Sequence, residues 1–539
     1  MYFPRSICRL YFATCLLDFA APTEPLSPQP DESGAFHIAI IGAGIAGASA
    51  AYNLHRHSVS GIERNQGLKI TVYEASPIVG GQVKTIYPQG SEHALEAGAS
   101  YFFEDDWCLS ETARSLDLER QVAPQSAGTM IWNGYRLLED RFCFNDAPRA
   151  ATPRFWDTIP SNILQTVKKF IIRSLAGVDS EWELGSLPWG FRSGITTLQD
   201  RLKSLGRNSV FGSLHDELDK VGLGDTIKSS AEDFLHAFAV PNSFQTSVVE
   251  PCVEALFGLN IKEATGLHIV ASMGSGRSPP ITIMSGNEKL ITQMLQESRA
   301  RLHVNSQVTK IETGSQKRFS LTIAPTKSTK QTREEHDIVI FTGDSMARLR
   351  PQGSKLLSKT SQRHVTHFAT ARTLDTKTFG LELGWNPSTL LTTANSSYID
   401  GGTRIVRLTT FPEFYIDRSG CYSDDECDQF VHVHRVDSRA PVSETKLQSM
   451  AYDLKNPGLN PVTWIHTQSW NHKPPVGNST DSHSVAYQFE PEPNVLNANS
   501  DLIDTMEMSC RMGRNAALKL LQTTLLSNGL SQGEEVAGF

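Results

Sequence analysis

The most informative hydrophobic pattern of the chain lies between residues 35 and 75. An apolar run, FHIAII at residues 36–41, leads into a glycine-rich turn, which is followed by the small and apolar residues of AGASAAYNLHRH. A second apolar run, KITVYEA, occupies residues 69–75. Because strand, turn, helix and strand follow one another over the length of a single crossover, this segment predicts a βαβ unit and therefore a parallel sheet.

Long amphipathic stretches with helical spacing dominate the chain between about residues 116 and 267. They are NILQTVKKFIIRSLAG, TTLQDRLKSLG and SLHDELDKVGL, and they predict a mainly helical insertion. After it, HDIVIFTGD at residues 336–344 predicts another buried strand, and MEMSCRMGRNAALKLLQTTLL at residues 506–526 predicts a C-terminal helix. Elements of one sheet domain therefore recur in separated pieces of the chain.

The two ends of the chain lack the pattern of a folded core. Residues 1–21 resemble a secretory signal peptide, because Arg5 and Arg9 precede an apolar stretch that ends in small residues, whereas Asp18 favours a frayed extension instead. Residues 22–34 are typical of a linker, and residues 527–539 form a tail. A signal peptide would place the protein in the secretory pathway, in a lysosome or vacuole, or outside the cell.

Composition and charge exclude several classes of protein. Hydrophobic residues make up 39 % and charged residues 20 %, with a net charge of −8, as in an ordinary globular protein. The chain has neither a long Lys/Arg run nor about 18 uninterrupted apolar residues, so neither nucleic acid nor a transmembrane span is expected. The eight cysteines form no zinc or CxxC pattern, and no metal site is predicted. Cys421 and Cys427 either close a small disulfide loop or remain free thiols.

The glycine-rich turn carries candidate chemistry. It reads Gly42-Ala43-Gly44-Ile45-Ala46-Gly47, which fits G-x-G-x-x-G, a motif whose glycines allow a sharp turn and a close approach to a pyrophosphate. Glu74 closes the second predicted strand, where its carboxylate can accept both hydroxyls of a ribose and disfavours a ribose 2′-phosphate. Strand, motif, helix and acidic residue together predict a dinucleotide site.

Two further segments resemble amine-oxidase-like flavoproteins and, with the glycine-rich turn, imply FAD. Gly80, Gly81 and Gln82 follow Glu74 in an E-x5-G-G-(R/Q) arrangement, although most family members carry Arg in place of the Gln. Gly98-Ala99-Ser100 resembles the segment beside the flavin ring. Val308 matches the position where such proteins present backbone to the adenine, or is an ordinary buried strand residue.

The fold class implied is α/β, with a Rossmann-like FAD-binding domain of glutathione-reductase-like, amine-oxidase-type topology. Residues 35–120, 275–345 and 480–526 would form this discontinuous domain. An inserted, largely helical plus β substrate domain would occupy residues 121–274 and 346–479.

Several segments are more specifically similar to the prenylcysteine oxidase (prenylcysteine lyase) family. In chain order they are GAGIAGASAAYNL, EAGAS at 96–100, SGNEKL at 285–290, LLTTANSS at 390–397, NHKPP at 471–475 and TMEMSCRMGRNAAL at 505–518. The likeness spans about residues 36–522. In related folds the C-terminal helix points its N-terminus at the flavin, which adds Met506 and Glu507 to the expected cofactor residues. Departures from the family occur at Gln82, Asp344 and Ser500.

The resemblance implies an oxidase that removes hydride from the allylic carbon of a prenyl thioether. Prenylcysteine would yield a prenyl aldehyde, free cysteine and, with molecular oxygen as acceptor, hydrogen peroxide. No catalytic side chain is predicted, because the flavin itself carries the hydride transfer. Alternatives are an FAD-dependent oxidase of another isoprenoid or lipophilic molecule, and a non-catalytic lipid-binding relative. A lipophilic substrate also allows peripheral membrane association.

Some residues of the predicted substrate domain have two interpretations. An apolar chain needs an apolar pocket, and the aromatic and aliphatic residues of the insertion either line it or belong to the core. The candidates are Phe155, Phe170, Ile171, Phe234, Phe238 and Phe257. Likewise His93, His268 and His367 are either proton carriers or buried structural histidines. Trp470 and His472 either line the substrate entrance or precede a surface Pro-Pro bend.

Overall fold

The computed structural model of the 539-residue chain describes most of it between residues 35 and 527. The described residues are 35–61, 67–88, 91, 93–123, 129–133, 137–139, 143, 178–179, 189–273, 278–313, 318–326, 330–342, 361–370, 374, 388–393, 399–400, 403–417, 428–451, 462–472, 495–499 and 502–527. The predicted signal peptide, the linker, nearly all of the tail and the pair Cys421 and Cys427 lie outside them.

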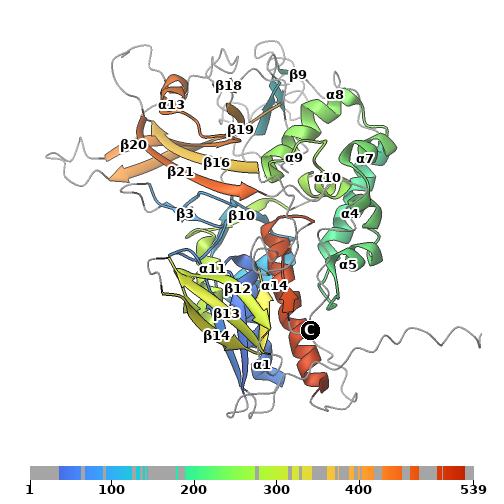
Figure 1. The fold of residues 1–539 in the computed structure, drawn as a ribbon. Helices are drawn as coiled ribbons and strands as arrows, with labels where there is room; N and C mark the ends of the chain where they lie inside the picture. Colours follow the sequence, from blue (N-terminus) through green and yellow to red (C-terminus); the bar gives the residue numbers. More distant parts are fainter. Residues whose placement is uncertain are drawn as a thin grey trace, which may run out of the picture.

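A five-stranded parallel sheet forms the centre of the lower domain in Figure 1. Its strand order is β11-β2-β1-β15-β22. The strands are β1 (Phe36–Ile41), β2 (Leu68–Tyr73), β11 (Arg301–His303), β15 (Ile338–Phe341) and β22 (Val495–Asn497). The predicted βαβ unit and the strand predicted within residues 336–344 are therefore confirmed.

Alternate residues of β1 serve two hydrophobic cores, because successive side chains of a strand point to opposite faces. Ile38 and Ile40 pack with helix α1 (Ile45–Gly61) and with α14 (Met506–Ser527). Ala39 and Ile41 pack against an antiparallel sheet on the other face. That sheet consists of β12 (Ser306–Thr313), β13 (Phe319–Pro325) and β14 (Thr332–His336).

Helices cover the first face of the parallel sheet. α14 runs along α1, and α11 (Glu288–Glu297) packs on α1 as well (Figure 1). The approach of α14 to α1 requires a glycine, since a Cβ on Gly513 would meet the carbonyl oxygen of Ala46 in the first turn of α1. The predicted C-terminal helix is thus confirmed, and its N-terminal half lies beside the glycine-rich turn.

A nine-stranded sheet and a group of helices form the upper part of Figure 1. The sheet contains β7 (Thr129–Trp132), β8 (Leu137–Glu139), β9 (Val178–Asp179), β16 (Ser361–Thr370), β17 (Thr389–Thr392), β18 (Ile399–Asp400), β19 (Thr403–Asp417), β20 (Asp428–Ser438) and β21 (Val462–His472). The helices are α4 (Trp189–Ser204), α5 (Leu214–Lys220), α6 (Gly224–Lys228), α7 (Ala231–Ala237), α8 (Asn242–Phe244), a π-helical turn (Gln245–Val249), α9 (Glu250–Phe257) and α10 (Gly266–Ser272), with α13 (Glu444–Met450) after β20. α4 and α5 confirm two of the predicted amphipathic helices, and the third, at residues 162–177, lies outside the described residues.

Short elements connect the two parts. They are β3 (Thr85–Ile86), β4 (Leu95–Glu96), β5 (Phe102–Phe103), helix α2 (Trp107–Ser115), β6 (Arg120–Val122) and β10 (Pro280–Ile283). Two disulfides, Cys108–Cys510 and Cys143–Cys252, link residues far apart in the sequence.

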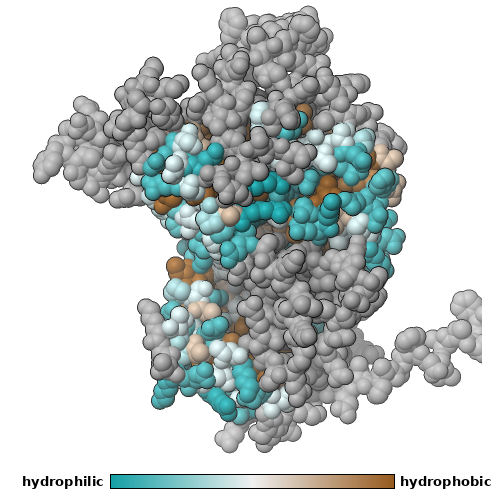
Figure 2. All heavy atoms as spheres, turned by 45° about the horizontal axis from the view of Figure 1, so that its top comes forward, coloured by the Kyte–Doolittle hydropathy of each residue, from teal (hydrophilic) through white to brown (hydrophobic). Residues whose placement is uncertain are grey.

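Apolar surface occurs in small areas on the face shown in Figure 2, where brown patches are separated by hydrophilic side chains. Large hydrophobic residues that are exposed include Ile78, Tyr87, Val122 and Met284. No helix within the described ranges has the length and hydrophobicity needed to cross a membrane.

Candidate functional site

The two predicted glycine segments lie against each other at the carboxyl end of β1. The N–H of Gly80 donates to the carbonyl oxygen of Ala43 at 2.9 Å, and Gly44 pairs with Gly80 in an isolated parallel bridge. A Cβ on Gly44 would lie 3.9 Å from the Gly80 oxygen and the Gly81 Cα. Gly80 has a φ of 115°, which side-chain-bearing residues rarely adopt. The loops thus form a cradle without side chains, as a pyrophosphate requires.

Glu74 organises this cradle from the end of β2. Its Oε2 accepts the N–H of Ala43 and its Oε1 accepts the N–H of Ser76, both at 2.8 Å. Each carboxylate oxygen has two lone pairs, so each can also accept a ribose hydroxyl. The N–H of Ser306 donates to the Glu74 carbonyl oxygen at 2.7 Å, which brings the start of β12, and with it Val308, close to this position. Val308 itself is buried in the core between the sheets.

The segment of Gly98, Ala99 and Ser100 lies beside Gln82. The N–H of Ala99 donates to the carbonyl oxygen of Gln82 at 3.0 Å. Asn287, in the segment SGNEKL, donates from its side chain to the Ser100 carbonyl oxygen at 3.1 Å and from its backbone to Glu96 Oε1 at 2.7 Å. Segments that carry the family resemblance therefore hold one another in place.

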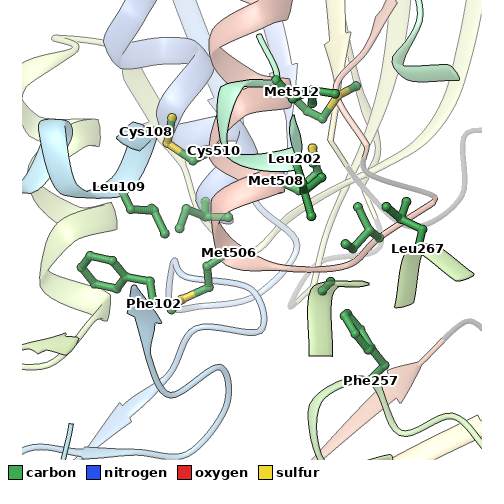
Figure 3. Close-up of a cluster of buried hydrophobic side chains, with 14 of the residues drawn as sticks. Phe102, Cys108, Leu109, Leu202, Phe257, Leu267, Met506, Met508, Cys510 and Met512 are labelled. Atoms are coloured by element: carbon green, nitrogen blue, oxygen red, sulfur yellow. A yellow bond between two sulfur atoms is a disulfide. The ribbon is translucent and has the colours of Figure 1, made fainter. Parts of the chain in front are cut away.

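Met506 and Glu507, at the N-terminus of α14, line a cavity. Figure 3 shows Met506 beside Phe102, which lines the same cavity. Glu507 accepts the N–H groups of Cys108 and Leu109 at 3.0 Å each and is paired with Arg511 at 2.6 Å. Its carboxylate therefore caps helix α2. The expected contact of Glu507 with the cofactor stays a prediction.

A cavity of about 140 Å³ lies between these segments and the nine-stranded sheet. One wall contains Gln82, Gly98, Ala99, Ser100, Phe102, Phe103, Met506 and Glu507. The opposite wall is formed by side chains of the sheet, namely Arg363 and Val365 of β16, Arg407 of β19, Arg435 of β20 and Trp470 of β21. Six of the sixteen predicted cofactor residues thus line this cavity: Gln82, Gly98, Ala99, Ser100, Met506 and Glu507.

The three arginines of the sheet wall form a buried ion-pair network with Asp437. Arg363 donates to Asp437 Oδ2 at 3.1 Å, Arg407 pairs with the same oxygen, and Arg435 Nε donates to Oδ1 at 2.8 Å. Burial alone would raise the pKa of Asp437, but the three guanidinium groups outweigh it and hold that pKa well below its usual range. Burial lowers the pKa of Arg435 to about 10, so Arg435 stays charged at neutral pH.

Arg435 also connects the two walls. Its guanidinium donates to the carbonyl oxygens of Glu96 and Gly98 at 2.9 and 3.1 Å and to the hydroxyl of Ser100. These acceptors lie in the segment predicted to pass beside the flavin ring. Arg435 therefore positions that segment against the sheet.

Two donors of the sheet wall lack an acceptor in the described part of the chain. They are Nε of Arg407 and Nε1 of Trp470, and both side chains line the cavity. Such buried donors are costly unless a ligand or water accepts from them. Arg407 and Arg435 are not among the predicted site residues, although both sit among apolar residues in strand-like runs, a pattern that can indicate a buried charge.

Other candidates from the sequence lie elsewhere. Phe234 and Phe257 belong to the main hydrophobic core and Phe238 packs against it, which agrees with the core interpretation. The remaining candidates of that set lie outside the described residues. His268 bonds Thr265 in a capping box, which is a structural role. His367 is fully buried, and burial, together with Arg435, lowers its pKa well below 6.5, which makes it a poor proton carrier at neutral pH.

Comparison with known proteins identifies the family. A family model for prenylcysteine lyase matches residues 201–529, and a model for an NAD(P)-binding Rossmann-like domain matches residues 40–116. The chain belongs to the prenylcysteine lyase family. Prenylcysteine oxidase 1 of Bos taurus is 24 % identical over 351 residues, which cover 63 % of this chain and 58 % of that protein. The counterpart of Rattus norvegicus is 24 % identical over 318 residues, covering 57 % and 53 %. The match therefore spans little more than half of either relative.

Solved structures show which fold this member of the prenylcysteine lyase family has. Cyclohexylamine oxidase from Brevibacterium oxydans has a TM-score of 0.53 at 14 % identity, covering 91 % of this chain and 99 % of that one. This likeness confirms the predicted α/β fold of amine-oxidase type. Family and fold together confirm the predicted FAD-binding Rossmann-like domain. The side-chain-free cradle and the Glu74 carboxylate fit FAD.

Proposed function

We propose that the protein is an FAD-dependent thioether oxidase that cleaves S-prenyl cysteine. The observation that carries this proposal is the family match over residues 201–529, because these residues supply both the sheet wall of the cavity and the N-terminus of α14. The cavity between the predicted flavin-side segments and the sheet is the site proposed for the substrate.

Apolar side chains of the cavity would hold the prenyl chain and exclude water from it. They are Phe102, Phe103, Leu202, Leu256, Ile503 and Met506. With the chain held between two walls, the role of the protein is to orient the carbon next to sulfur. Arg435 supports this role, because it fixes the flavin-side segment relative to the sheet.

The proposed reaction needs little acid–base help from side chains. Loss of hydride from the allylic carbon leaves a sulfur-stabilised cation, water adds to that carbon, and the carbon–sulfur bond of the hemithioacetal breaks to give a prenyl aldehyde and the thiol of cysteine. Bound FAD would supply the two-electron oxidation and pass the electrons to oxygen. The balance is one thioether, one water and one oxygen in, and one aldehyde, one cysteine and one hydrogen peroxide out.

An anaerobic titration of flavin-loaded protein with S-farnesyl-L-cysteine tests this function. We expect the visible flavin absorbance to bleach, and farnesal and hydrogen peroxide to appear in equal amounts when air is admitted. Flavin that stays oxidised at saturating S-farnesyl-L-cysteine would overturn the proposal.

A second candidate is oxidation of another isoprenoid or lipophilic molecule. The departures from the family at Gln82, Asp344 and Ser500 favour it, as does the 24 % identity to the mammalian relatives. A panel of allylic thioethers, alcohols and amines in the same titration separates the two candidates. Colourless protein that cannot be reconstituted with FAD would instead favour the lipid-binding alternative.

We also propose a secretory, lysosomal, vacuolar or extracellular location. The two disulfides support it, because such bonds persist mainly in oxidising compartments. Asn395, followed by Ser396 and Ser397, and Asn478, followed by Ser479 and Thr480, fit the N-x-S/T pattern for N-linked glycans. They provide a test, since glycosidase treatment of the protein from its native source should lower its apparent mass. An unglycosylated chain with reduced Cys108 and Cys510 would contradict this location.

A further inference from the structure

We infer that the sheet wall of the cavity is a carboxylate-binding subsite for the cysteine end of the substrate, with Arg407 and Arg363 as its specificity-determining residues. This inference rests on the proposed function for the identity of the substrate. The charge and the unpaired donors described below support it independently of any reaction.

The sheet wall carries an excess of positive charge. Arg363, Arg407 and Arg435 face one acidic partner, Asp437, so two guanidinium charges are not neutralised within the network. The other ionised residues that line the cavity come from α4, α14 and the segments next to β5 and α14. They are Lys203, Asp106, Asp504, Glu507 and Arg511, of which the last two pair with each other.

The three arginines differ in how many of their N–H donors already have an acceptor within the protein. The donors of Arg435 are used within the protein, because they bond Asp437 and three acceptors in residues 96–100. Arg407 is 3 % exposed, pairs with Asp437 and keeps an Nε–H without an acceptor in the described residues. Arg363 bonds Ala255, Leu256 and Asp437 but leaves 23 % of its side chain exposed.

Trp470 adds a second unpaired donor to the same wall. It pairs with Arg363 in the register of β21 with β16, and its ring lies next to Gly98, where a Cβ would be 3.2 Å from Cζ2. An indole N–H and a guanidinium N–H both need an acceptor, and a protonated amino group offers none. An anionic acceptor that enters between apolar walls satisfies the donors and the charge together. A carboxylate on a lipophilic thioether has this combination.

The test measures equilibrium binding to flavin-loaded protein by calorimetry. The probes are S-decyl-L-cysteine and its methyl ester, which differ in one negative charge. Because a decyl chain has no allylic hydrogen, the proposed oxidation does not consume either probe. We expect the acid to bind at least about tenfold more tightly than the ester, as for a hydrogen bond to a charged group.

Arg407→Gln should remove this preference while leaving the affinity for the ester unchanged. Asp437 keeps two arginine partners in this variant, so the network retains its buried pair. Arg407→Lys should restore part of the preference. Arg207→Gln is the matched control, since Arg207 is an exposed partner of Glu111 and does not line this cavity. Should Arg407→Gln not fold, Arg363→Gln provides the same comparison.

Equal affinity of the wild-type protein for acid and ester would overturn the inference, as would an Arg407→Gln variant that keeps the preference. A third result would also overturn it, namely loss of affinity for both probes together with a shifted flavin spectrum, because the acceptor of Arg407 would then be the flavin. These results are independent of the proposed function. If the protein prefers the acid but does not oxidise S-farnesyl-L-cysteine, the inferred subsite stands and the proposed function is wrong.

Discussion

Cys108 in α2 and Cys510 in α14 form a disulfide across 402 residues of sequence (Figure 3). Glu507 strengthens the same junction, since it accepts the N–H groups of Cys108 and Leu109. Helix α14 is therefore held to α2 by a covalent bond and by a helix cap, next to the cavity that its first residues line.

Replacing both cysteines of this disulfide with alanine should lower the free energy of unfolding by about 3 kcal/mol, within the range for loss of a native disulfide. FAD retention should fall as well, because the N-terminus of α14 loses its tether. Denaturant unfolding and flavin absorbance after gel filtration measure the two effects. The matched control is the pair Cys143 and Cys252, whose replacement should affect stability only. Unchanged stability of the first variant would contradict the assigned bond.

Glu74→Gln should weaken FAD binding by about tenfold or more. The amide nitrogen of glutamine cannot accept a hydrogen bond, so one of the bonds from Ala43 and Ser76 is lost, together with an acceptor for a ribose hydroxyl. Titration of apoprotein with FAD provides the dissociation constant. Glu335→Gln, on the exposed strand β14, should have no effect. Equal FAD affinities of the Glu74 variant and wild type would count against Glu74 as a cofactor residue.

Substitutions at Gly44 should separate folding from cofactor binding. The space for a Cβ, at 3.9 Å from Gly80 and Gly81, accommodates alanine within the protein. The branched side chain of valine extends into the cradle between the two loops and should reduce bound FAD to less than about a tenth of stoichiometric, whereas Gly44→Ala should retain more. Flavin-to-protein absorbance ratios measure this. A valine variant with stoichiometric FAD would show that the pyrophosphate lies elsewhere.

The buried carboxyl of Glu96 should make stability depend on pH. Burial raises its pKa from 4.5 to about 8, outweighing the hydrogen bonds from Asn287 and Thr85 and the nearby charge of Arg435. The folded state thus keeps a proton that the unfolded state releases above pH 4.5, and this stabilisation is lost as pH rises through 8. Relative to Glu96→Gln, the wild-type free energy of unfolding should fall by up to about 4 kcal/mol between pH 5 and 8, at ~1.4 kcal/mol per pH unit. Parallel pH profiles of the two proteins would refute the raised pKa.

Local pattern was enough to predict the elements around the nucleotide cradle. β1, α1, β2 and α14 follow directly from apolar runs, glycines and helical spacing, because each buries a face that its own sequence defines. The cradle followed as well, since Glu74 and the glycine loops meet at the ends of neighbouring parallel strands.

The sheet wall of the cavity could not be predicted in the same way. Arg363, Arg407, Arg435 and Asp437 lie on three strands, and they meet only through the register of β16, β20 and β19. In the sequence, HVHRVDS alternates like a strand with one face in water, whereas its arginine and aspartate are buried as an ion pair. The disulfides were missed for a similar reason, since partners 402 and 109 residues apart leave no spacing pattern.

The packing of α14 on α1 has a consequence for how the protein is made. Cys510, which closes the bridge to Cys108, is synthesised 402 residues after it, and Gly513, which meets Ala46, follows Cys510. The nucleotide-binding domain therefore cannot close until α14 has been synthesised, whereas helices α4 to α10 are contiguous in the sequence and can pack together earlier. A stop codon anywhere before residue 506 leaves a product without the helix that completes the cofactor domain.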